Sequence, residues 1–193
     1  MIELNGNSLT IEKVWKISQG EKISICPESM KKVKASRETV EKIIKEERVV
    51  YGITTGFGHL CNTRIDKSDL QRLQVNLIRS HATGVGDPYP RDAVRASIVV
   101  RINSLLHGVS GVRPELIEAL TALLNSDVVP HVPQQGSVGC SGDLAPLSHI
   151  ILVLMGEGEV LCEDGHSICP ALPALQKAGL KPICLEAKEG LAL

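Results

Sequence analysis

The sequence has few aromatic residues, no surplus of charge of either sign and no apolar run long enough for a membrane. Aromatic residues make up 2% of the 193 positions, so platforms that stack nucleic-acid bases are poorly supported. The 21 basic and 22 acidic residues give a net charge of −1, and no basic stripe marks a surface for nucleic acid or a membrane. The most apolar stretch, residues 144–155, is too short to span a bilayer.

The start of the chain and its cysteine spacing favour a reducing compartment. The first ten residues lack a basic region followed by an apolar one, so no signal peptide is expected. The cysteines form no CxxC pair and no spacing typical of a metal site. We therefore predict a cytoplasmic protein with free thiols and no bound metal. The six cysteines are Cys26, Cys61, Cys140, Cys162, Cys169 and Cys184.

Hydrophobic spacing predicts a mainly α chain with a few short strands, forming a single domain over residues 1–193. Four amphipathic helices are expected, because apolar residues recur at helical spacing after a proline or an N-cap residue. The residues that open these helices are Pro27, Asp66, Pro90 and Pro114. A fifth helix, over 144–155, follows Asp143 and is so apolar that we expect it to be buried on every side. Strands are predicted at 48–53, 159–162 and 182–185.

Two glycine-rich segments interrupt the helical pattern, at 51–58 and 136–143. Glycine at this density indicates positive φ angles or close approach of backbones. The second segment contains a serine and a cysteine, but a nucleophile elbow needs glycine where Asp143 stands. No cysteine-protease signature surrounds Cys140, and no Gly-Lys-Ser/Thr follows as in a phosphate-binding loop. These patterns disfavour acyl transfer and phosphate binding.

A cyclisation suits the tripeptide Cys140-Ser141-Gly142 better. In a tight bend, the nitrogen of the glycine can attack the carbonyl carbon of the first residue, and water is lost. A second dehydration, at the serine, leaves an imidazolone that carries an electrophilic methylidene carbon. Glycine is needed third because its nitrogen must approach without a Cβ clash. The N-terminus of the following helix favours negative charge that develops at this loop.

Residues 136–149, GSVGCSGDLAPLSH, closely resemble the signature of the aromatic amino-acid ammonia-lyases, which build a 4-methylidene-imidazol-5-one group from Ala-Ser-Gly. Residues 51–58 resemble the family's loop with a catalytic tyrosine, and 188–193 resemble the segment before its Asn-Gly-Thr. Cys140 departs from the family's alanine. The chain is also well under half the family's length, so the resemblance implies the N-terminal part of that fold, without its central helical bundle.

Residues 74–81, QVNLIRSH, resemble the segment that selects the substrate in this family. Ser80-His81 resembles the pair in its histidine-specific members, whereas tyrosine lyases have His-Leu and phenylalanine lyases have Phe-Leu. The resemblance therefore implies a carbon–nitrogen lyase that eliminates ammonia from L-histidine and gives trans-urocanate. It also implies a homo-oligomer, a tetramer in the family, or a complementing C-terminal chain. A non-catalytic fragment or a partner subunit of a split lyase remains an alternative.

The resemblance also implies a role for each residue of the site. Tyr51 would remove the β-proton of the substrate, while Ser80 and His81 would contact its imidazole. The tripeptide would form the electrophile autocatalytically, with no external cofactor. The site residues are Tyr51, Gly58, Ser80, His81, Cys140, Ser141, Gly142 and Asp143, of which Gly58 and Asp143 are supporting. Packing or surface roles are expected for His107, His149 and His166.

Overall fold

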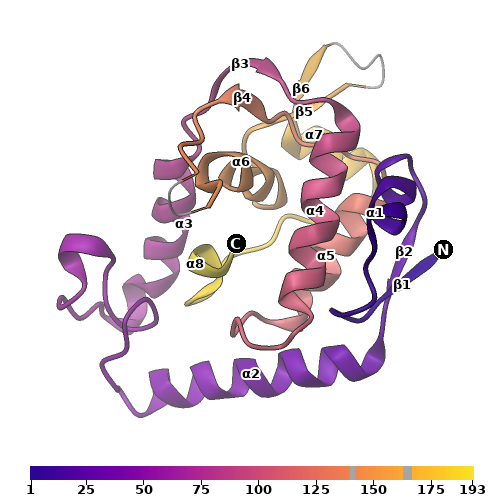
Figure 1. Ribbon diagram of the computed structural model, residues 1–193. Coiled ribbons are helices and arrows are strands. Elements are labelled where there is room, and N and C mark those ends of the chain that lie inside the picture. Colours follow the sequence, from indigo (N-terminus) through magenta and orange to yellow (C-terminus); the bar gives the residue numbers. More distant parts are fainter. Residues whose placement is uncertain (140–141, 163–166) are drawn as a thin grey trace.

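The computed structural model describes residues 1–139, 142–162 and 167–193, and Figure 1 shows them as a helical body edged by small two-stranded sheets. The helices are α1 (Ile11–Ser18), α2 (Pro27–Lys45), α3 (Leu70–His81), α4 (Arg91–Leu105), α5 (Pro114–Asn125), α6 (Leu144–Leu154), α7 (Ala171–Lys177) and α8 (Glu189–Ala192). The 3-10 turns are η1 (Gly58–Leu60) and η2 (Lys67–Asp69). The strands are β1 (Ile2–Leu4), β2 (Ile23–Ile25), β3 (Val85–Pro88), β4 (Pro133–Gln135), β5 (Glu159–Leu161) and β6 (Ile168–Pro170).

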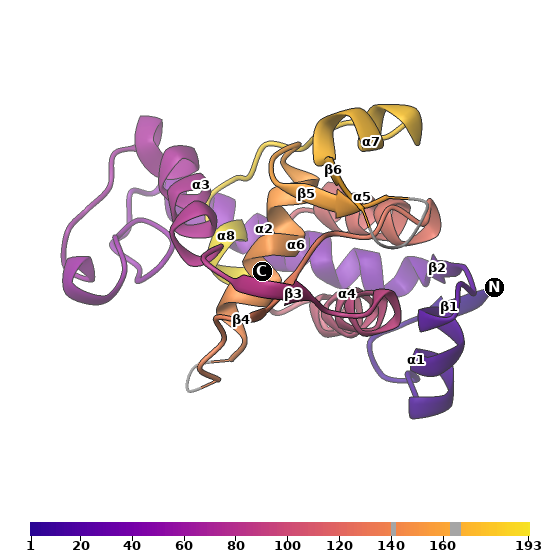
Figure 2. The same cartoon turned by 90° about the horizontal axis from the view of Figure 1, so that it is seen from above.

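The three sheets are local pairings at the edge of the helices. Strand β1 pairs with β2 in parallel, whereas β3 pairs with β4 and β5 pairs with β6 in antiparallel register. The β3–β4 pair places the segment after α3 beside the segment that leads into α6, which Figures 1 and 2 both show. This pairing therefore sets the end of α3 beside the segment that carries the second glycine-rich stretch.

The core is built mainly from α4 and α5, as the apolar spacing predicts. Apolar side chains at helical spacing in both helices are at most 1% exposed. They are Leu116, Ile117, Leu120, Leu123 and Leu124 of α5 and Ile98, Ile102 and Leu105 of α4. The helix α2 runs across the base of the molecule in Figure 1 and buries Val33, Val40 and Ile43. The predicted helical segments are therefore confirmed, although α3 begins after Asp69, and Asp66 precedes only the turn η2.

Two of the three predicted strands are wrong. Residues 48–53 form a turn because the Thr54 hydroxyl donates to the carbonyl of Arg48 (2.6 Å) and accepts from the amide of Val50 (2.9 Å). The segment 182–185 pairs with no strand among the described residues. Only the prediction at 159–162 is confirmed, by β5.

The prediction of free thiols is wrong for Cys162 and Cys169, which form a disulfide with their Cα atoms 5.6 Å apart. The antiparallel pairing of β5 with β6 brings them together, and cysteine spacing alone does not reveal that pairing. Cys26, Cys61 and Cys184 are free thiols, and Cys140 lies outside the described residues. Because disulfides are uncommon in a reducing compartment, this one gives no support to the cytoplasmic location, which stays a prediction.

The helix α6 is not buried on every side, contrary to expectation. Leu144 is 45% exposed, and Leu147 and Leu152 are only partly buried. The other side of the helix packs into the core through Ile150, Ile151 and Val153. Across the described ranges, no helix combines the length and apolar character that crossing a membrane requires.

Candidate active site

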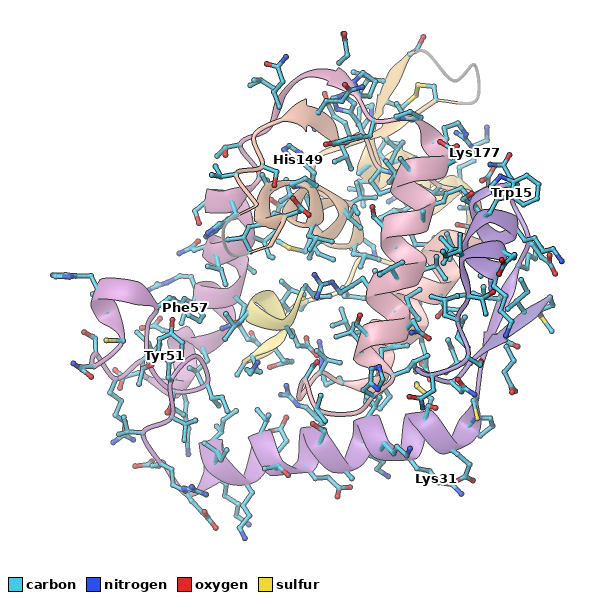
Figure 3. The ribbon with its side chains drawn as sticks, in the orientation of Figure 1. Trp15, Lys31, Tyr51, Phe57, His149 and Lys177 are labelled. Atoms are coloured by element: carbon cyan, nitrogen blue, oxygen red, sulfur yellow. A yellow bond between two sulfur atoms is a disulfide. The ribbon has the colours of Figure 1, made fainter. Side chains whose placement is uncertain are left out.

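The loop that carries Tyr51 is held by its threonines and by close packing against α8. The Thr55 hydroxyl accepts from the amide of Gly52 (3.3 Å), which closes the first part of the loop. A Cβ atom at Gly52, where φ is +70°, would overlap the side chain of Leu191. The ring of Tyr51 meets that of Phe57 edge to face, with centroids 6.3 Å apart. Figure 3 shows both rings at the same end of the molecule.

The Tyr51 side chain is available to a ligand or to another chain. It is 56% exposed, and its hydroxyl has no hydrogen-bond partner among the residues that the structure describes. Gly58, the supporting residue, starts the turn η1 with φ of +52°, a backbone shape that glycine adopts most readily. The loop therefore presents a phenol on a backbone that is fixed at both ends.

Ser80 and His81 end the helix α3. The Ser80 hydroxyl donates to the carbonyl of Leu77 (2.8 Å), and His81 Nδ1 lies 2.8 Å from the same oxygen. Because a carbonyl oxygen can only accept, Nδ1 of a neutral His81 is the protonated nitrogen, and Nε2 is left as an acceptor. This geometry equips His81 to receive a hydrogen bond from a ring N–H.

Two described glycines of the segment 136–143 are bridged to each other, and we call this bridged pair the bend. Gly139 and Gly142 form an isolated antiparallel bridge, and both have positive φ, +73° and +91°. Cys140 and Ser141, predicted to enter the ring, lie outside the described residues. Asp143 occupies the N-cap position of α6, and its side chain makes no capping bond. Its Oδ1 instead accepts from the Ser137 hydroxyl (2.6 Å), which ties the two arms of the bend.

Within one chain, the structure brings together only part of the predicted site. Ser80 and His81 end α3 beside the segment between β4 and α6, which carries the bend. Residues 50–66 instead lie at the start of α3, and Figures 1 and 2 both show them apart from that segment. Residues 50–66 precede α3 and the Ser80-His81 pair ends it, and a helix of 12 residues spans about 18 Å.

A family model described as aromatic amino acid lyase matches residues 9–193, almost the whole chain. The chain belongs to the aromatic amino acid lyase family. Among curated relatives, histidine ammonia-lyase of Bacillus cytotoxicus is 53% identical over 194 residues, covering 100% of this chain and 38% of that protein. The chain therefore spans little more than a third of the length of these relatives.

Solved structures of aromatic amino acid lyases and related enzymes share this fold. Histidine ammonia-lyase from Trypanosoma cruzi matches with a TM-score of 0.91 and 39% identity, covering 100% of this chain and 37% of that one. Tyrosine aminomutase from Streptomyces globisporus matches with a TM-score of 0.92 and 38% identity, covering 99% and 36%. The chain thus has the fold of the N-terminal part of these lyase-family structures, as the resemblance implies.

Sequence reasoning missed a buried anchor in this lyase chain. Glu189 of α8 is fully buried, and its carboxylate accepts bonds from the backbone amide, Nε and Nη2 of Arg113 and from the amide of Glu186. The bonds to Glu189 raise the pKa of Arg113. The only sequence signal was the match of 188–193 to the family, which gave no role to this carboxylate.

Gln74 joins the same helix to α3. Its side chain is fully buried, and Oε1 accepts from the amide of Leu191 (3.2 Å). A Cβ atom at Gly190 would lie 2.8 Å from the Gln74 carbonyl oxygen, so the two backbones touch. Because Leu191 in turn packs against Gly52, α8 connects α3 to the loop of Tyr51.

Proposed function

We propose that this chain is the catalytic N-terminal part of a histidine ammonia-lyase, which eliminates ammonia from L-histidine and leaves trans-urocanate. The observation that carries the proposal is the bridge between Gly139 and Gly142, in a chain of the aromatic amino acid lyase family. Two observations support histidine as the substrate. They are the Ser80-His81 pair and the name histidine ammonia-lyase borne by a relative 53% identical.

The described residues fit the formation of a 4-methylidene-imidazol-5-one group. The bridge between Gly139 and Gly142 holds these two glycines against each other. A turn closed in this way favours attack of a glycine nitrogen on the carbonyl two residues earlier. No atom of the described residues lies within 4 Å of a Cβ position at Gly142. Once formed, the group supplies an electrophilic carbon to the substrate, and no external cofactor is needed.

The chain's own residues would bind the substrate ring and move the proton. His81 would accept a hydrogen bond from the imidazole of the substrate at Nε2, since Nδ1 is held by Leu77. Ser80 would support that contact from the same helix end. Tyr51 would take the β-proton, a role that requires its exposed hydroxyl to face the substrate.

A homo-oligomer would complete the site. In one chain, the segment 50–66 lies apart from the segment between β4 and α6, so a second copy is the simplest source of the missing group. Apolar side chains near the bend favour the same conclusion, because Val138 is 86% exposed and Leu144 is 45% exposed. The tetramer that the family resemblance implies is one such assembly.

A second candidate is a partner subunit that a separate chain completes. Such a subunit would supply the bend and the Ser80-His81 pair, and the other chain would supply the remaining substrate contacts.

The mass of the peptide 136–149 and its ultraviolet absorbance test the proposal. In a chain extended to the length of its relatives, we expect the loss of two waters and turnover of L-histidine. In residues 1–193 alone, we expect an unmodified peptide and negligible activity, because misplaced reactants cost orders of magnitude in rate. Activity regained by adding a separate C-terminal chain would favour the partner subunit. An extended chain with neither ring nor turnover contradicts the proposal.

Replacing His81 tests the assignment of the substrate. In the extended enzyme, we expect His81→Leu to lower kcat/KM for L-histidine by about 5- to 150-fold, because a ring N–H loses its acceptor. The matched control is His81→Gln, which keeps a polar atom near Nε2 and should lose less. The assay compares L-histidine, L-tyrosine and L-phenylalanine. An unchanged preference among the three after His81→Leu would rule out the assigned role.

A further inference from the structure

The histidine of the helix α6 makes a contact that neither a packing role nor a surface role explains. His149 Nε2 accepts a hydrogen bond from the backbone amide of Gly84 at 3.0 Å. Figure 3 labels His149 on the side of α6 nearest the strands β3 and β4. The bond joins residues 65 positions apart, so it fixes tertiary structure rather than local structure.

Gly84 lies three residues after His81, on a short and constrained tether. The amide of Ala82 donates to the carbonyl of Ile78 (3.0 Å), and that of Thr83 donates to the carbonyl of His81 (2.9 Å). Any shift of Gly84 is therefore passed to the end of α3, where the Ser80-His81 pair lies. The bond from Gly84 to His149 holds that end in place.

A third segment, residues 133–136, also packs against Gly84 and leads to the bend. A Cβ atom at Gly84 would lie 3.1 Å from His149 Nε2 and 3.2 Å from Pro133 Cβ. A Cβ atom at Gly136 would lie 2.9 Å from the Gly84 Cα. The backbone of Gly84 is thus packed between α6, which follows the bend, and residues 133–136, which precede it.

We propose that His149 is a positioning residue that sets the distance between the Ser80-His81 pair and the two described segments beside the bend, residues 133–136 and the start of α6. This inference rests on the proposed function, since it assigns the two parts to one substrate site. His149 does not touch the substrate. It acts through Gly84, by holding the loop after α3 against the helix that follows the electrophile.

The imidazole must be neutral to play this role, because protonated Nε2 cannot accept a hydrogen bond. Burial lowers the pKa of His149, the nearby His131 lowers it further, and Glu159 opposes them. His131 itself lies against Glu159, with Nδ1 3.3 Å from the carboxylate. A lowered pKa keeps the bond intact at neutral pH, and the bond is lost as the pH falls through that value.

The test compares His149→Gln with His149→Leu, because glutamine can place an acceptor where Nε2 lies and leucine cannot. In residues 1–193 labelled with 15N-glycine, hydrogen exchange of the Gly84 amide is measured by NMR. We expect exchange to be about tenfold faster in the leucine variant and within about threefold of the parent in the glutamine variant. His131→Gln is the matched control and should leave the Gly84 amide protected.

The extended enzyme gives the second measurement. We expect His149→Leu to lower kcat for L-histidine at least about tenfold with ring absorbance unchanged, and His149→Gln to restore most of it. Two results would overturn the inference, provided that the parent enzyme is active. One is an equal kcat for His149→Leu and His149→Gln, and the other is a Gly84 amide that stays protected in His149→Leu. A parent that forms no ring and does not act on histidine contradicts the proposed function instead, and the exchange experiment still reports the bond.

Discussion

We expect Tyr51→Phe in the extended enzyme to lower kcat for L-histidine by about 10²- to 10⁴-fold, the range typical of a lost general base. The substitution removes only the hydroxyl and keeps the edge-to-face contact with Phe57, so the loop should retain its shape. The KM should change little, because the phenol acts on the β-proton rather than on the groups that hold the substrate. Steady-state kinetics at saturating substrate measure this effect.

Tyr89→Phe is the matched control for this experiment, because Tyr51 and Tyr89 are the two tyrosines of the sequence. The control should leave kcat near that of the parent. Absorbance of the ring, measured in both variants, separates loss of the base from loss of the electrophile. Full kcat in Tyr51→Phe with an intact ring would show that another group takes the proton.

We expect Glu189→Gln to destabilise residues 1–193 by about 3–5 kcal/mol, the cost of breaking a buried ion pair on one side. The carboxylate accepts four hydrogen bonds, three from Arg113 and one from the amide of Glu186. An amide NH₂ cannot accept the two bonds that one of these oxygens receives, so donors would be left unpaired beside it. The midpoint of urea unfolding, with its slope, measures the change.

Glu186→Gln provides the control from the same segment. Its carboxylate lies 4.0 Å from Arg113 Nη1 and its side chain is 32% exposed, so this pair is a weak one. We expect its loss to change the free energy of unfolding by no more than about 1 kcal/mol. Equal midpoints for the two variants would mean that burial of Glu189 adds nothing to stability.

The sequence predicts what local spacing determines. The apolar positions of 114–125 recur at helical intervals after Pro114, and the leucine and isoleucine side chains of α5 are all buried. The glycine signature of 136–143 likewise predicts a bend, because positive φ is a local property of Gly139 and Gly142. Such features depend on neighbours in the chain, so one sequence suffices to predict them.

The missed features depend on partners far along the chain. Glu189 looks like a charged residue of an exposed tail until Arg113, 76 residues earlier, is placed against it. The bond between His149 and Gly84 and the disulfide of Cys162 with Cys169 also depend on tertiary pairing. The false strand at 48–53 has a different cause, since the side chain of Thr54 competes with strand pairing for the backbone.

The hydrogen bonds made by residues 187–191 also constrain the order in which the chain folds. Arg37 is 6% exposed, and its Nη1 donates to the carbonyl of Ala187 (2.8 Å), which is synthesised 150 residues later. The hydrogen bonds of Gln74 and Arg113 described above likewise need residues of α8 as partners. Closing such long loops costs entropy before any contact repays it. On the ribosome, the bonds that α2, α3 and α5 make to residues 187–191 would therefore form only after those residues have emerged.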